Sequence, residues 1–82
     1  MPRYSYRRDV LDELARHGVI PTPRTPPALV HEFVSGLYRR ELRRLRDRLR
    51  RCEFPKREYF GRVVELRTRY ALISMRPDEW VE

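Results

Sequence analysis

Apolar residues recur at alternating spacings of four and three on both sides of Pro55. Before this proline the repeating residues are Tyr38, Leu42, Leu45, Leu49 and Cys52. After it they are Tyr59, Val63, Leu66, Tyr70 and Ile73. Such a repeat keeps one stripe of a helix turned toward a neighbouring helix. The two stripes therefore predict two long helices that pack against each other.

The segment before Pro55 predicts a long helix for so short a chain. Thr25 precedes two prolines, which is typical of a helix start with threonine as the N-cap. Gly36 costs about 1 kcal/mol within a helix and is tolerated. A helix over residues 26–52 would be about 40 Å long, whereas a compact chain of 82 residues is about 30 Å across. Another segment must therefore cover its far end.

A second helix over residues 56–74 is predicted to supply this cover. The connection between the two helices is short, and a short connection favours an antiparallel helical hairpin. The pairs expected across it are Leu49 with Tyr59, Leu45 with Val63, Leu42 with Leu66 and Tyr38 with Tyr70, or a register shifted by one turn. The open sides of such a hairpin would suit a homodimer, in which two hairpins form a four-helix bundle.

A short first helix is predicted over residues 5–17. Val10 and Leu14 lie on one apolar stripe of this segment, and Ser5 is placed to cap its start. Gly18 follows where a helix often ends with a left-handed residue. The N-terminal third of the chain is therefore expected to contribute one helix to the core.

The remaining segments predict a connector and a tail. Residues 18–25 are rich in proline and predict an extended connector, from which Val19 and Ile20 are expected to pack onto the core. Residues 75–82 are expected to form a tail with a brief turn at Pro77 and with Trp80 folded back.

An alternation of apolar and polar residues over 64–72 leaves a strand as the alternative to a helix there. A lone strand would need a partner, and the rest of the chain offers only short candidates. We therefore favour an all-α fold, with one small domain over residues 1–82.

Size and composition point to a small soluble protein. No apolar run reaches the roughly 18 residues that span a bilayer, and the N-terminal residues lack the apolar stretch of a signal peptide. The single cysteine, Cys52, allows no disulfide within the chain. We expect a cytoplasmic protein without membrane contact.

The positive charge is concentrated in one segment. The net charge is +7. Residues 39–51, RRELRRLRDRLRR, hold eight arginines against Glu41 and Asp47, which leaves +6 there and +1 on the rest of the chain. The position of the charge along the chain therefore says more about a possible partner than the net charge does.

On a helix, the eight arginines surround the leucine stripe on all its open sides. One flank of the stripe carries Arg39, Arg43, Arg46 and Arg50. The face turned away from it carries Arg40, Arg44 and Arg51, and the other flank carries Arg48. Asp47 can pair with arginines three or four residues away, but one acid cannot neutralise the outward face.

Guanidinium groups are always charged and offer planar donors that suit phosphate and carboxylate. A row of them along a helix would bind an RNA or DNA backbone through counterion release, without base specificity. The sequence thus predicts a polyanion-binding face made of Arg39, Arg43, Arg44, Arg46, Arg50 and Arg51.

Two other interpretations remain open for the arginine-rich segment. The arginines could form a solvated face of a helical interaction or oligomerisation module, or they could dock an acidic protein. Arginine stems also shield apolar seams, and cations favour a helix C-terminus.

A catalytic or metal centre is not expected. Cys52 falls on the predicted seam and has no obvious histidine base nearby, so we interpret it as a buried, inert thiol. His17 and His31 lack the spacing of metal ligands, and His17 suits a carbonyl contact at a helix end. Glu41 lies close to the leucine stripe and is expected to pair with Arg69 or Arg67. We therefore predict a protein that is not an enzyme and holds no cofactor.

Overall fold

The computed structural model describes residues 3–82 and is all-α. Residues 1 and 2, which the predicted domain over 1–82 includes, lie outside the described part. In chain order the elements are α1 (Arg8–Arg16), α2 (Pro27–Arg50), η1 (Lys56–Glu58), α3 (Tyr59–Arg69), η2 (Ala71–Ser74) and η3 (Pro77–Trp80), where η marks a 3₁₀ helix. No strand forms among residues 3–82, so the strand alternative for residues 64–72 is wrong.

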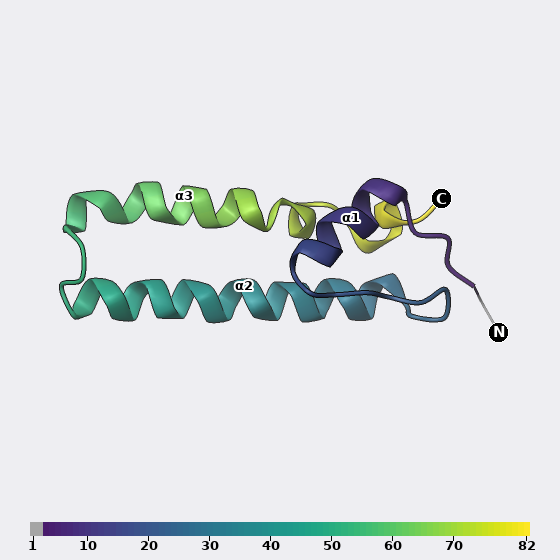
Figure 1. The fold of residues 1–82 in the computed structure, drawn as a ribbon, viewed down its shortest axis with the longest axis horizontal. Coiled ribbons are helices and arrows are strands. Elements are labelled where there is room, and N and C mark those ends of the chain that lie inside the picture. The colour runs from purple at the N-terminus through teal and green to yellow at the C-terminus, as the bar shows by residue number, and fades with distance from the viewer. Residues whose placement is uncertain (1–2) are drawn as a thin grey trace.

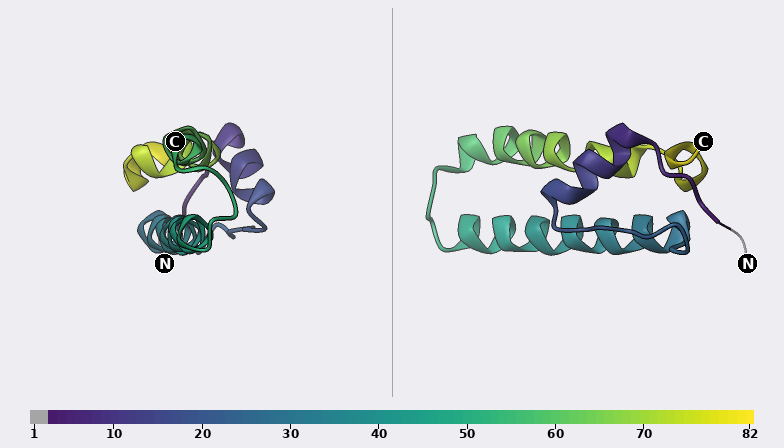
Figure 2. Two further views of the ribbon diagram at one scale, coloured as in Figure 1. Left: turned by 90° about the vertical axis from the view of Figure 1, so that its left-hand side faces the viewer. Right: turned by 45° about the vertical axis from the view of Figure 1, so that its right-hand side comes forward.

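The molecule is elongated, with principal extents of 50, 18 and 17 Å. Figure 1 shows α2 and α3 side by side and joined at one end by a short link, so that the chain doubles back. At the other end α1 and the C-terminal 3₁₀ helices gather around the pair. Viewed along the pair, α1 lies on one side and the C-terminal segment on the other (Figure 2). The far half of α2 therefore has α3 as its one covering element within the described residues.

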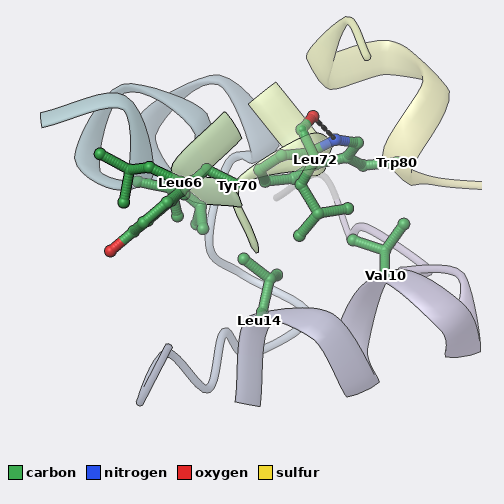
Figure 3. Packing of buried hydrophobic residues seen from close by; sticks show 8 residues of the cluster. Val10, Leu14, Leu66, Tyr70, Leu72 and Trp80 are labelled. Carbon is green, nitrogen blue, oxygen red and sulfur yellow. Dashed lines mark hydrogen bonds between the residues drawn. The ribbon is translucent and has the colours of Figure 1, made fainter. Parts of the chain in front are cut away.

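The main core lies at the end where α1, η2 and η3 meet the α2–α3 pair. Its buried residues are Val10, Leu14, Val30, Val34, Leu66, Tyr70, Leu72 and Trp80. Figure 3 shows the indole of Trp80 beside Leu72, whose carbonyl oxygen accepts a hydrogen bond from the indole Nε1 at 3.3 Å. Trp80 is fully buried, so the predicted return of the tail onto the core is confirmed.

The first helix begins later than predicted. α1 starts at Arg8, and Ser5 provides no cap. Instead, the preceding backbone is extended and pairs with the C-terminus: the Arg7 N–H donates to the Trp80 carbonyl, and the Glu82 N–H donates to the Ser5 carbonyl, each at 2.9 Å. These tertiary hydrogen bonds replace a further helical turn. The predicted left-handed residue after the helix is confirmed, because Gly18 has a φ of 74°.

The connector also differs in detail from the prediction. Thr25 does not cap α2, because its hydroxyl oxygen accepts a hydrogen bond from the Thr22 N–H at 3.0 Å within a local turn. α2 therefore begins at Pro27, with Pro26 in the N-cap position. Val19 is partly buried against the core, but Ile20 is 84% exposed, so its predicted packing is wrong.

The link between α2 and α3 corrects the prediction for Cys52. α2 ends at Arg50, and Cys52 takes a left-handed conformation with a φ of 59°. The thiol is exposed, because this reversal turns the residue off the helical stripe. Phe54, which is 7% exposed, is buried at this end of the pair instead.

The last predicted helix, over residues 56–74, is divided into three. η1 precedes α3, and α3 ends at Arg69, before η2. No proline or glycine breaks the chain there. Side chains from other elements take up its carbonyls instead: His17 Nε2 donates to Arg69 at 2.9 Å, and His31 Nε2 lies 3.1 Å from the carbonyl of Ile73 and 3.0 Å from that of Met75. The sequence around Arg69 does not reveal these hydrogen bonds, because His17 and His31 lie far away along the chain.

Candidate polyanion-binding surface

The six arginines predicted to bind a polyanion are all exposed. Five of them lie on the C-terminal half of α2, and Arg51 is its C-cap residue. This half of α2 lies in the elongated part of the molecule, away from α1 (Figure 1). The fold thus leaves the outer side of the helix open to solvent.

Three of the six predicted arginines have a carboxylate nearby. Arg39 pairs with Glu32 at 3.2 Å, and Arg50 lies 3.8 Å from Asp47. Arg51 pairs with Glu53 at 2.9 Å. Exposed pairs of this kind are weak, at about 0–1 kcal/mol. These acids screen part of the predicted surface.

Four arginines of the segment have no carboxylate within 4.0 Å among the described residues. They are Arg40, Arg43, Arg44 and Arg46. Three belong to the predicted set. The predicted set does not include Arg40, although the outward position of this residue on the helix is a signal that could have included it. We call these four residues the free arginine cluster.

Glu53 holds the chain beyond α2 against the end of that helix. Its carboxylate accepts hydrogen bonds from Arg51 Nε at 2.9 Å and from Arg48 Nε at 3.1 Å. The hydrogen bond from Arg51, followed by that from Arg48, keeps the pKa of Glu53 below its ordinary value. Glu53 therefore neutralises two arginines that lie next to the free arginine cluster.

The same link is packed around Phe54. The guanidinium of Arg62 lies 4.3 Å from the ring centroid, and that of Arg48 lies 5.5 Å from it. Cations over an aromatic face are attracted to its negative quadrupole. Two arginines are thus committed to holding α2 and α3 together, and they are poorly placed to bind a ligand.

One groove between α2 and α3 is lined mainly by charged residues. Glu41 on α2 lies 3.9 Å from Arg69 on α3, as the sequence predicted. The groove is also lined by Arg44, Arg48 and Arg62. Arg62 is paired with Glu58 at 3.1 Å, so that most cations of this ionic groove already have acids beside them.

The groove on the opposite side of the pair is apolar. It is a hollow of about 460 Å³ lined by Tyr38 on α2, by Val64 on α3 and by Ala71 and Ile73 on η2. Val64 is 42% exposed, and Phe60, one turn before it, is 76% exposed. We call this surface the apolar groove. Val64 and Ala71 are exposed there, whereas Tyr38 and Ile73 are half-buried against the core.

A second apolar patch lies at the start of α2. Leu29 and Phe33 are 64% and 57% exposed. Together with Val19 and Val30 they line a hollow of about 430 Å³. Sequence reasoning missed both apolar surfaces, because it assigned most apolar residues to the core.

A further hollow, of about 590 Å³, lies where α1 meets the pair. Its charged residues are Glu13, Arg16, Glu41 and Arg69, and His17 lies among them. Glu13 is paired with Arg16 at 3.1 Å, and His17 donates to a backbone carbonyl. These groups satisfy one another. They are not arranged as a nucleophile with a base.

Residues 3–82 contain no cluster of metal-ligating side chains. Within the same residues, none of the helices combines the length and the apolarity needed to cross a membrane. Comparison of the chain with family models, with curated proteins and with solved structures gives no match. The function must therefore be argued from the surfaces of the protein alone.

Proposed function

We propose that this protein is a small non-enzymatic helical protein that binds the phosphate backbone of RNA or DNA through the outer face of α2. The observation that supports this proposal best is the free arginine cluster, Arg40, Arg43, Arg44 and Arg46. Four exposed guanidinium groups within seven residues have no acid beside them. Cations that are already paired gain less from a phosphate, because an existing partner must be displaced.

The geometry of the cluster suits a backbone ligand rather than a single small anion. Residues 40–46 span about 9 Å along the helix, and the long side chains extend this reach. The cluster can therefore contact several successive phosphates. Because no aromatic side chain stands among these arginines for bases to stack on, we expect binding to depend little on base sequence.

A fluorescence anisotropy titration tests the proposal. The ligand is a labelled oligonucleotide of about 20 bases, titrated at several salt concentrations. If four phosphates are neutralised, log K should fall with log salt at a slope of about −3 for a single strand and nearly −4 for a duplex. Absence of binding at low salt would overturn the proposal.

The second candidate is a helical protein–protein interaction module. In this candidate function, α2 and α3 form the long antiparallel hairpin that the two apolar stripes predict. Its partner is either a second copy of the chain, as in the predicted homodimer, or an acidic protein. The observation in its favour is the exposure of Phe60 at 76% and of Val64 at 42%, one turn apart on α3, since contiguous exposed apolar surface marks interaction sites. Sedimentation velocity at several protein concentrations tests self-association, and a constant monomer would exclude the homodimer.

A further inference from the structure

The two long sides of the α2–α3 pair differ in charge as well as in polarity. On the ionic side, Glu41 pairs with Arg69 and Glu58 pairs with Arg62. At about 100° per residue, Glu65 falls on that same side of α3. Asp47 falls on the outer face of α2, where it pairs with Arg50. Every acid of α2 and α3 from residue 38 onward therefore lies away from the apolar groove.

Both helices, by contrast, carry a cation on the side of the pair that holds the apolar groove. Arg67 on α3 lines it directly. On α2, Arg46 lies about 100° from the buried Leu45, in the direction opposite to Glu41. Neither arginine has a carboxylate within 4.0 Å among the described residues. The groove thus has a free guanidinium in its lining on α3, and a second one lies on the same side of α2, nearer to the link.

We infer that the apolar groove is the docking site of an acidic amphipathic helix from a partner protein. The apolar stripe of such a helix would cover Val64 and Phe60, and the acids on its two edges would meet Arg46 and Arg67. Helices commonly bind in grooves of this kind through residues spaced three and four apart. The inference rests on the second candidate function, and it shares Arg46 with the free arginine cluster that is proposed to bind nucleic acid.

The charge pattern decides against a second copy of the chain as the occupant. A second copy would bring the same cations to the interface and no acid from its own groove to meet them. Like charges placed opposite one another across an interface are unfavourable. A partner helix with acidic edges removes this repulsion.

A nucleic acid is also a poor occupant of this groove. Phosphates would be satisfied by Arg46 and Arg67, but a charged backbone would leave Phe60 and Val64 without apolar cover. Burying apolar surface contributes about 25 cal/mol per Å², and this gain requires an apolar partner. An apolar surface with cations beside it therefore favours a protein helix over a nucleic acid.

The register of the pair fixes the spacing that the partner must match. Tyr38 lies beside Tyr70, so Arg67 is nearly level with residue 41. Arg46 is then five residues further along α2, or about 7.5 Å away along the groove. Acids about one and a half turns apart on opposite edges of the partner helix would meet these two arginines.

The test uses a synthetic helical peptide of about five turns, with leucine at alternating spacings of four and three and with glutamate on both edges. The control peptide has lysine in place of every glutamate. We expect the acidic peptide to bind with a Kd in the micromolar range and the lysine peptide to bind at least tenfold more weakly. Failure of the acidic peptide to bind, or equal binding of both peptides, would overturn the inference.

Two pairs of variants locate the binding site. Val64→Asp should weaken peptide binding about tenfold or more, because it places a charge in the apolar groove. Leu29→Asp makes the same change in the separate patch at the start of α2 and should leave binding unchanged. Arg67→Gln should weaken binding several-fold, whereas Arg57→Gln, which removes an exposed arginine of η1, should not. Circular dichroism confirms that each variant is folded.

Two further outcomes would assign the groove to another occupant and overturn the inference. One is a protein dimer that Val64→Asp converts to a monomer in sedimentation. The other is an oligonucleotide whose binding is lost in Val64→Asp or Arg67→Gln. Oligonucleotide binding that persists in both variants keeps the two proposals separate, since the free arginine cluster is then intact while the groove is altered.

Discussion

The rings of Tyr38 and Tyr70 meet edge to face, with their centroids 5.6 Å apart. Tyr70 also stacks on His17, with centroids 4.3 Å apart. One side chain thus joins α2 to the end of α3 and to the residue that follows α1. Because Tyr70 is 6% exposed, its loss should affect the whole end of the molecule where the core lies.

Replacing Tyr70 with alanine should lower the free energy of unfolding by about 3–5 kcal/mol, as for other buried aromatic residues. Urea denaturation followed by circular dichroism measures this change. The matched control is Phe60→Ala, which removes an aromatic residue that is 76% exposed and should change stability by no more than about 0.5 kcal/mol. Equal effects of the two substitutions would contradict the placement of Tyr70 in the core.

The conformation of Cys52 predicts an unusual effect of glycine. A left-handed conformation costs a residue with a Cβ atom roughly 1 kcal/mol, and glycine avoids this cost. Cys52→Gly should therefore stabilise the protein by about 0.5–1 kcal/mol, whereas Cys52→Val should destabilise it by a similar amount or more. Thermal denaturation under reducing conditions measures both. If Cys52 were a buried residue of the helical seam, glycine would be the more damaging substitution.

The lowered pKa of Glu53 predicts a pH dependence. A carboxyl whose pKa is lower in the folded state stabilises that state above its unfolded pKa, and this stabilisation is lost as pH falls through the folded value. The hydrogen bonds from Arg51 and Arg48 are the cause of the shift. Glu53→Gln should therefore lower Tm at pH 7, and this difference from the wild type should shrink as pH falls from 7 toward 3 and more of the wild-type carboxyl becomes protonated.

Glu65→Gln is the control for this pH dependence, because Glu65 has no cation within 4.0 Å among the described residues. It should change Tm little at either pH. A difference between wild type and Glu53→Gln that stays constant from pH 7 to pH 3 would show that the carboxylate of Glu53 does not hold the link between α2 and α3.

The apolar periodicity of the sequence was sufficient to predict an all-α fold and the contact of Tyr38 with Tyr70. A 4-3 spacing of apolar residues is a local property of the chain. The helices that it predicts do form, because their apolar stripes pack against each other. Element boundaries were less predictable. Ser5 and Thr25 have the chemistry of N-caps, yet the carbonyl of Ser5 pairs with Glu82 and the hydroxyl of Thr25 serves a local turn. Contacts between distant residues overrode the local preference.

The location of the candidate surface could be predicted from the sequence, but the set of arginines that remain without a nearby acid could not. The arginine count fixed the outer face of α2 as the cationic surface. Which arginines are free depends on acids that the fold brings near, and the reversal at Cys52 carries Glu53 back onto Arg48 and Arg51. The apolar groove was not predictable, because periodicity identifies apolar residues without showing which of them another helix leaves uncovered.

The proposed polyanion-binding surface depends on where the arginines lie and not on the net charge of the protein. A variant with Arg40, Arg43, Arg44 and Arg46 replaced by glutamine removes the free arginine cluster. A matched variant with Arg8, Arg16, Arg24 and Arg76 replaced by glutamine has the same net charge and keeps the cluster. All eight side chains are exposed, so both variants should fold.

The measurement is oligonucleotide affinity against salt concentration for the wild type and these two variants. We predict that the cluster variant loses at least tenfold in affinity at low salt and that its slope of log K against log salt approaches zero. The matched variant should retain most of the wild-type slope. Equal losses in the two variants would contradict the account, because binding would then follow net charge alone.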